Sequence, residues 1–523
     1  MSSTAKVLKV ETEIVDDRKP VKQSSKLFWM AIMVTGIFSV WSLINPESLT
    51  TTLWGWVYKF HGYMNWFTIL IPISFFGICM FLAMSKYGKI KLGGKTAKPE
   101  FSTFSWISML FTAGIGVGLV NFGVAEPMVH YLQSPLGVSG GYTKVEAAKN
   151  ALTLSLFNWG LPAWTIYAIS GLVIAYFTYS RGARFLPGTP IEEGFKDKKW
   201  SKKLGSVTNV VAASAAALTM AASIGMGVFQ VKNGLEAITG FDLTGLTYSL
   251  VILLVLFLVY TLPALLPVKK GMKVLGDVNV IIAISLLIFV FCVGPTRYFM
   301  ESIVTTMGTT ITKILPISFN TYMFEAKGWF NDWPLTTFIW WISWTPFMGV
   351  FIARISKGRS IKEFVMASIL IPTVFLVAWF GVFGGFGLLD DIAGTGEIAK
   401  YITENPNDVY LSFIMVLQSL PLFSITGPIF VVLIIVFLAT GATSAAISLS
   451  MMTSNGVENA PVSRTLIWSI IMVTISFANV VTGTLSGVKA VAVFMGIPYT
   501  FFVIMQVSGF IRQLRNDNRK EIV

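Results

Sequence analysis

The stretch LTYSLVILLVLFLVYTLPALLPV, residues 246–268, decides the fold, because it contains no charged side chain. About 20 consecutive apolar residues suffice for a helix to cross the hydrocarbon core of a bilayer. Of the 523 residues in the chain, 54% are hydrophobic and only 12% are charged, about half of what soluble proteins carry. We therefore expect an all-α polytopic membrane protein and exclude a soluble protein.

Apolar runs of this kind recur along the chain and predict twelve transmembrane helices. They lie near 28–46, 62–84, 103–131, 150–178, 206–235, 246–268, 275–297, 334–355, 362–389, 427–453, 464–485 and 489–511. Residues 298–333 and 390–426 fall between spans and predict amphipathic or interfacial helices. Residues 1–27 are expected to be a polar cytoplasmic leader and not a cleavable signal peptide, and 512–523 a short solvated tail.

The lysines and arginines predict the orientation of these helices. Residues 86–98 and 196–203 carry five lysines each, whereas the loops on the opposite side of the predicted membrane carry few positive charges. By the positive-inside rule both termini are cytoplasmic, and the plasma membrane is the expected location. The net charge of +13 thus reflects topology, and the expected macromolecular partner is the lipid bilayer, not nucleic acid.

No motif of a catalytic or metal site accompanies the spans. The two cysteines, Cys79 and Cys292, lie inside apolar runs, and the two histidines form no HExxH pattern. We expect no enzymatic activity, no cofactor and no metal. A passive channel is a poorer fit, because rings of like charge or a carbonyl-rich filter sequence are missing.

The third predicted span contains GIGVG at 114–118, where Gly114, Gly116 and Gly118 alternate. Two interpretations are open. Glycine lets a membrane helix unwind, so that backbone amides approach a ligand. A stripe of small residues also lets neighbouring helices pack closely.

Aromatic residues gather in the eighth and fourth spans. WWISWTPFMG at 340–349 holds three tryptophans before Pro346 and Gly349, which are expected to break the helix. Trp341 lies about 20 Å along the helix from the cytoplasmic basic cluster, which is mid-membrane. NWGLPAWTIY at 158–167 repeats the pattern around Pro162. A quaternary ammonium has no N–H donor, and aromatic faces hold it with about 0.5–2 kcal/mol per ring.

Breaks in spans three and eight, five helices apart, predict two inverted five-helix repeats. The repeats cover about 103–297 and 334–511, with two extra helices before them. In such transporter folds the substrate lies where the first helices of the two repeats are broken.

Five stretches carry a family resemblance. They are PEFSTFSW (99–106), GVAEP (123–127), NWGLPAW (158–164), WWISWTPF (340–347) and ARISKGRS (353–360). With them the chain resembles the betaine/choline/carnitine transporter family over nearly its whole length. The resemblance implies the fold of sodium-coupled amino-acid transporters, alternating access, a homotrimer, and a trimethylammonium substrate such as glycine betaine or carnitine.

The resemblance also implies site residues. Trp159, Trp340, Trp341 and Trp344 correspond to the substrate box, while Trp164 and Tyr167 match aromatics that line the path or the site. The amides of the glycine stretch are expected to receive a substrate carboxylate.

The coupling-ion positions depart from the sodium-dependent members of the family. Thr440 is kept, but Gly441 replaces a serine, and Ala216 and Met220 replace two threonines. A hard cation needs the lost oxygens. These departures favour sodium-independent exchange or uniport, with a sodium- or proton-coupled symporter of glycine betaine or choline as the alternative.

Two further positions resemble the family's carnitine/γ-butyrobetaine antiporter. Lys273 aligns with an arginine and Met348 with a methionine that there stand in for sodium. Lys273 can equally be a lysine that sets topology, and Met348 a flexible filler. Val129 departs from the antiporter, which has a tyrosine there. Glu126, an acid within an apolar run, is expected near the outer end of its span, in a hydrogen-bonding role or in proton coupling.

Overall fold

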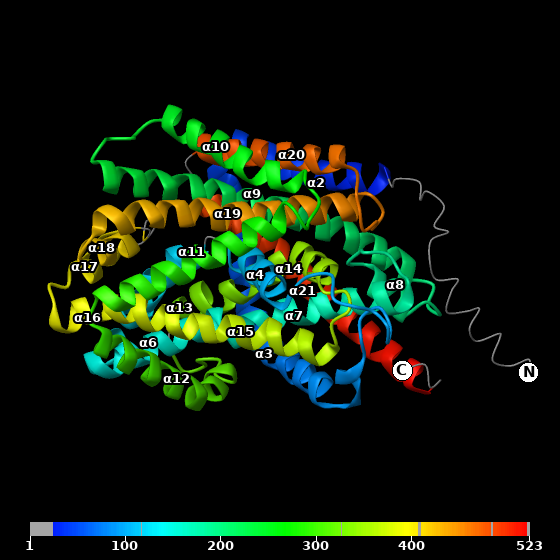
Figure 1. Ribbon diagram of the computed structural model, residues 1–523, viewed down its shortest axis with the longest axis horizontal. Coiled ribbons are helices and arrows are strands. Elements are labelled where there is room, and N and C mark those ends of the chain that lie inside the picture. Colours follow the sequence, from blue (N-terminus) through cyan, green and yellow to red (C-terminus); the bar gives the residue numbers. More distant parts are fainter. Residues whose placement is uncertain are drawn as a thin grey trace, which may run out of the picture.

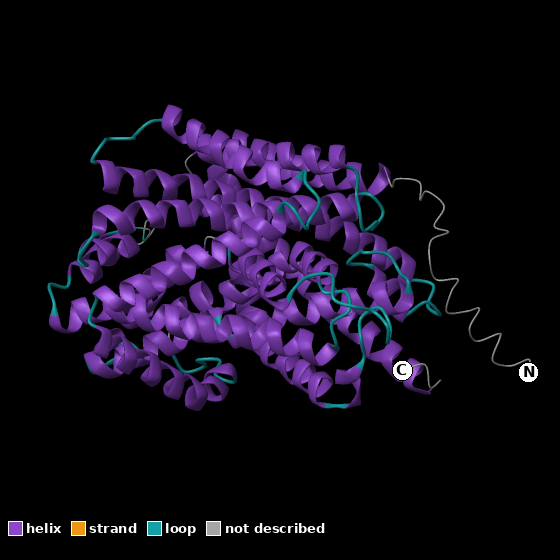
Figure 2. Ribbon diagram, viewed as in Figure 1, coloured by secondary structure: helices purple, strands orange, loops and turns teal. Residues whose placement is uncertain are grey.

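A computed structural model describes residues 25–116, 118–325, 327–405, 409, 411–482 and 485–519. Figures 1 and 2 show that these residues form a bundle of helices lying side by side. Among the described residues the β pairing is limited to one isolated bridge, between Lys91 and Ser360. The expectation of an all-α protein is confirmed.

The helical elements follow the chain in a simple order. They are α2 (Ser25–Ile44), α3 (Pro46–Met84), η1 (Lys86–Lys89), α4 (Thr103–Ile115), α5 (Gly118–Gln133), η2 (Val138–Gly140), α6 (Lys144–Trp159), α7 (Leu161–Ala175), η3 (Tyr176–Ser180), α8 (Thr189–Gly194), α9 (Ser201–Thr239), α10 (Leu246–Ala264), α11 (Met272–Val293), α12 (Thr296–Ser318), α13 (Gly328–Phe330), η4 (Asn331–Leu335), α14 (Thr336–Ile355), α15 (Ile361–Trp379), η5 (Phe380–Gly384), α16 (Gly385–Ala393), α17 (Glu397–Glu404), α18 (Ser412–Gln418), α19 (Phe423–Thr453), α20 (Val462–Thr482) and α21 (Leu485–Arg519).

Eleven of these helices or joined helices are long and apolar enough to cross a membrane, and the bent pair α4–α5 makes a twelfth. The expected segments between spans are helical as well: α12 follows span seven, and α17 and α18 follow span nine. After α2 and α3 the chain makes two sets of five crossings. Because five is odd, the second set starts on the opposite side of the membrane from the first and is inverted relative to it.

Two boundaries differ most from the sequence expectation. The second span begins at Pro46, sixteen residues before the expected position, since proline suits a first helical turn and Asn45 caps the helix by accepting from Ser48 N. At the other end, α21 continues through most of the expected solvated tail. Asp517 there is buried and accepts from the Tyr176 hydroxyl at 2.5 Å. This hydrogen bond holds the C-terminal end of α21 against the rest of the bundle.

A second contact also holds the last helix. Arg512 donates to Asp197 Oδ1 at 2.6 Å, and this hydrogen bond lowers the pKa of Asp197 to about 2.

The residues 1–24 of the expected leader and 520–523 of the tail lie outside the described part of the chain.

The eighth span is not broken at Pro346 and Gly349, as the sequence suggested, but runs as one helix, α14. Proline removes a backbone donor and would leave the carbonyl of Ile342 without its partner. The Thr345 hydroxyl donates to that carbonyl instead. Gly349 serves close packing, because a Cβ there would lie 2.6 Å from Ser170 Oγ of α7.

The interruption in the aromatic spans falls in span four instead. Helix α6 ends at Trp159, Gly160 leaves the helical conformation, and α7 restarts with Pro162 in its first turn. The spans that carry the aromatic stretches are, together with α9, the most enclosed. In α6–α7, α9 and α14, 94% of the most apolar stretch is buried, against 22% in α2 and 33% in α10 and α11. The site therefore lies in the middle of the bundle.

Candidate functional site

The third span breaks inside its glycine stretch. Helices α4 and α5 meet at a bend of 58°. Gly116, the residue after α4, has φ 52° and ψ −155°, a conformation that is essentially restricted to glycine. Unwinding at mid-span, one of the two interpretations of GIGVG, is what the structure has. Residue 117 lies outside the described residues.

The same glycines also pack closely, but against tryptophan rings. A Cβ on Gly118 would lie 2.5 Å from Cη2 of Trp159, and one on Gly116 would lie 3.0 Å from Cη2 of Trp344. A Cβ on Gly114 would lie 2.9 Å from Cη2 of Trp164. Each glycine thus admits one indole to the broken backbone. The three glycines therefore leave the space that the tryptophan rings occupy.

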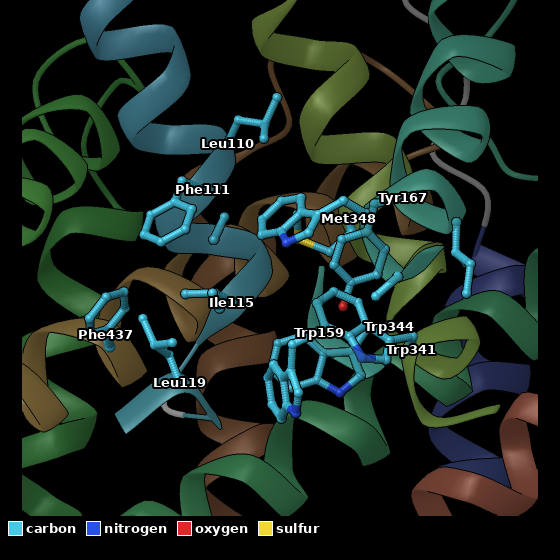
Figure 3. Close-up of a cluster of buried hydrophobic side chains, with 14 of the residues drawn as sticks. Leu110, Phe111, Ile115, Leu119, Trp159, Tyr167, Trp341, Trp344, Met348 and Phe437 are labelled. Atoms are coloured by element: carbon cyan, nitrogen blue, oxygen red, sulfur yellow. The ribbon is translucent and has the colours of Figure 1, made fainter. Parts of the chain in front are cut away.

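Five aromatic side chains expected at the site line one pocket together with Gly114 and Gly118. They are Trp159, Tyr167, Trp340, Trp341 and Trp344. Figure 3 shows Trp159, Tyr167, Trp341 and Trp344 gathered beside the broken span. The ring centroids of Tyr167 and Trp341 are 4.7 Å apart, those of Trp159 and Trp341 5.6 Å, and those of Trp340 and Trp344 6.4 Å.

Sequence reasoning missed other residues of the pocket wall. Phe122 closes the ring of aromatics, with its centroid 5.7 Å from Trp159 and 6.3 Å from Trp340. Further lining residues are Ile115, Asn121, Ser223 and Met226. The pocket residues include no Asp, Glu, Lys, Arg or His. Phe122 follows the glycine stretch by one helical turn, a spacing that makes it a neighbour of Gly118 and was available from the sequence.

Trp164 lies behind the pocket instead of lining it. Its side chain is fully buried, stacks on Phe111 at 5.9 Å and meets the edge of Trp341 at 5.9 Å. It therefore supports Trp341 from the side away from the pocket.

A polar network holds the far edge of Trp159. The indole Nε1 donates to Glu126 Oε2, and Asn158 Nδ2 donates to Glu126 Oε1 at 2.7 Å. His130 Nε2 lies 3.1 Å from the same Oε1. Glu126 is 1% exposed, so its carboxylate is buried, and its hydrogen bonds agree with the hydrogen-bonding role, one of the two roles expected for it. Its neighbours bury it because α6 packs directly over α5.

Of the residues at the coupling-ion positions, the structure brings Thr440, Gly441 and Met220 together. The Thr440 hydroxyl lies 3.1 Å from the carbonyl of Thr112 and accepts from Asn279 Nδ2 at 3.1 Å. A Cβ on Gly441 would lie 3.5 Å from Cε of Met220.

The remaining two positions add no oxygen ligand. Ala216 is buried one turn before Met220 on α9, and Met348 packs its Cε 3.0 Å from where a Cβ of Gly114 would be. The thioethers and methyl group here are poor partners for a hard cation.

Lys273 stands apart from this group. Its Nζ lies 3.3 Å from Asp277 Oδ2, and the side chain is 38% exposed. Asp277 also accepts from Ser105 at 2.8 Å. The residue of α11 that reaches Thr440 is Asn279, about 9 Å further along the helix. These contacts favour the interpretation of Lys273 as a lysine that sets topology.

A bundle of eleven or twelve spans that encloses an uncharged aromatic pocket beside a broken helix is the architecture of a secondary transporter. The family model of the betaine/carnitine/choline transporters matches residues 26–519. The chain therefore belongs to the betaine/carnitine/choline transporter family and is a transporter, not an enzyme.

Named relatives cover most of the chain. It is 33% identical to the glycine betaine transporter OpuD of Bacillus subtilis, over 96% of each protein. It is 32% identical to a glycine betaine transporter of Acinetobacter baylyi, over 96% of this chain and 76% of the relative. The high-affinity choline transport protein of Escherichia coli is 30% identical, over 98% and 75%. Among solved structures, MhsT in complex with L-phenylalanine has a TM-score of 0.48 at 13% identity, over 80% of this chain and 99% of MhsT.

Proposed function

We propose that this chain carries quaternary trimethylammonium compounds, such as glycine betaine or carnitine, across the plasma membrane by alternating access. The observation that carries the proposal is the pocket lined by six aromatic residues, with no charged side chain among its described lining residues. Each ring contributes about 0.5–2 kcal/mol to binding a desolvated cation. A primary amine has N–H donors that each need an acceptor, and few of the lining side chains carry one, whereas a trimethylammonium group has no N–H donor and needs none.

The broken span supplies a place for the other end of a zwitterion. Helix α5 begins at Gly118, a lining residue, so its N-terminal amides and the positive end of its dipole face the pocket. A carboxylate is stabilised at such a helix start. The proposed binding mode thus has the trimethylammonium group among the rings and the carboxylate at the Gly114–Gly118 break.

We further propose that transport needs no sodium gradient and proceeds by exchange or uniport. Supporting this, the Thr440 hydroxyl is already engaged by Asn279, and Gly441 faces the Met220 methyl group. Neither Gly441 nor Ala216 offers a side-chain oxygen. The alternative is sodium- or proton-coupled symport. Cytoplasmic termini and a homotrimeric assembly, which the family resemblance and the loop charges suggest, belong to the same proposal.

The test uses purified protein in liposomes preloaded with unlabelled glycine betaine. Entry of labelled glycine betaine is followed in sodium-free buffer, with and without a pH difference across the membrane. Exchange at the same rate in all conditions is the expected result. Uptake that requires sodium or a proton gradient would establish symport, and no uptake of glycine betaine, carnitine or choline under any condition would reject the substrate class.

A further inference from the structure

A carboxylate lies directly behind one ring of the pocket. Glu126 is not a lining residue, yet its Oε2 accepts the indole N–H of Trp159, which lines the pocket. Both side chains are almost fully buried, at 1% and 4% exposure. A buried acid is costly to hold in a membrane protein unless it is paired and hydrogen-bonded. Its position therefore calls for a reason beyond packing.

The neighbours of Glu126 supply the hydrogen-bond donors that a carboxylate needs. Trp329 Nε1 can only donate, and it lies 3.1 Å from His130 Nδ1, so that nitrogen is the acceptor. In the neutral imidazole the proton is then on Nε2, which faces Glu126 Oε1 at 3.1 Å. Together with Trp159 and Asn158, three donors converge on the two carboxylate oxygens. No oxygen is left that needs a proton to complete its hydrogen bonds.

A hydrogen bond to an anion polarises its donor. When the Trp159 N–H donates to the carboxylate, electron density shifts from the N–H into the ring, and the ring face becomes more negative. A cation over that face is attracted by the ring quadrupole, so its binding strengthens. A neutral group of the same shape gains nothing, because dispersion with the ring is hardly changed.

We propose that Glu126 is a positioning residue that acts through the Trp159 indole and makes the pocket selective for a permanent positive charge over a neutral group of the same shape. The inference rests on the proposed function, since it takes the aromatic pocket as the ammonium site. It assigns Glu126 a static electrostatic role in place of proton coupling. The ammonium of Lys489, which lies 5.8 Å from the Trp333 ring centroid, interacts electrostatically with Glu126 from α21.

The test compares glycine betaine with 3,3-dimethylbutanoate, in which a carbon replaces the nitrogen and only the ammonium charge is lost. Both affinities are measured by calorimetry on the purified wild-type protein and on Glu126→Gln. Glutamine is similar in shape but uncharged. We expect glycine betaine binding to weaken about tenfold and 3,3-dimethylbutanoate binding not to weaken. Equal weakening of both ligands would mean that Glu126 only shapes the pocket, and it would overturn the inference.

Two further variants separate the route through the indole from other effects. Trp159→Phe keeps an aromatic face but removes the N–H, and Glu126→Gln added to it is expected to change glycine betaine affinity by less than about twofold. An undiminished loss in that background would overturn the indole route. Glu301→Gln removes an exposed carboxylate that pairs with Arg297 on α12, and both affinities should stay unchanged. If the wild-type protein binds no glycine betaine, the proposed function itself fails, whatever Glu126 does.

Discussion

Gly118→Ala tests whether the glycine stretch exists to seat the aromatic pocket. The new Cβ would lie 2.5 Å from Cη2 and 2.9 Å from Cζ3 of the Trp159 ring. Ordinary contacts of a Cβ start at 3.4 Å, so the ring has to retreat by about 0.9 Å. It cannot retreat freely, because Glu126 holds its N–H and Trp341 lies 5.6 Å from its centroid.

The magnitude follows from these contacts. Overpacking of a rigid ring costs about 1–3 kcal/mol in stability. A displaced Trp159 also loses its contact with the ammonium, which is worth about 0.5–2 kcal/mol. At 1.4 kcal/mol for each factor of ten, glycine betaine affinity should fall by about 2-fold to 30-fold.

The assay is calorimetric titration with glycine betaine, alongside thermal unfolding of the detergent-solubilised protein. Gly225→Ala is the matched control, because its Cβ would lie 3.4 Å from Cβ of Asn479, an ordinary contact. Adding Trp159→Phe to Gly118→Ala removes the clashing atoms and should restore the melting temperature without restoring affinity. Wild-type affinity and stability in Gly118→Ala would refute the reasoning.

Two pairs of substitutions probe the remaining parts of the site. Trp341→Leu should weaken glycine betaine binding at least about tenfold, because Trp341 contacts the rings of Trp159, Trp164 and Tyr167. Trp66 is half-exposed, and Trp66→Leu should change the affinity little. Equal losses of affinity for the two variants in titrations would place the ammonium elsewhere. Asn279→Ala should impair exchange in liposomes strongly, since it removes the hydrogen-bond donor to Thr440. Lys273→Ala should slow exchange only mildly, because it breaks a half-exposed ion pair worth about 0–1 kcal/mol. A severe defect in Lys273→Ala that added sodium relieves would instead make Lys273 the substitute for the coupling cation.

The amino-acid sequence by itself determined whether each segment lies in the membrane or in water. A charge-free run such as 246–268 has few alternatives to a membrane helix, because a bilayer interior neither solvates charge nor satisfies an open backbone. Most spans could therefore be predicted. Most aromatic residues of the pocket, though not Phe122, were also predictable, since Trp340, Trp341 and Trp344 stand close together in one span, where an anchor at the membrane surface is the wrong explanation.

Only the tertiary structure decided which residues face each other. Gly118 and Trp159 lie on different helices, and no periodicity in either span indicates that the glycine admits that ring. The continuity of α14 depended on one hydroxyl, Thr345, replacing the donor that Pro346 lacks. The hydrogen-bond network of Glu126 depended on Trp329, an indole 203 positions further along the chain that donates to Nδ1 of His130. The polarity pattern of a sequence indicates whether a residue lies in water or in lipid. Pairings such as these arise instead from the packing of helices that are distant in sequence, because directional hydrogen bonds and steric contacts select one arrangement.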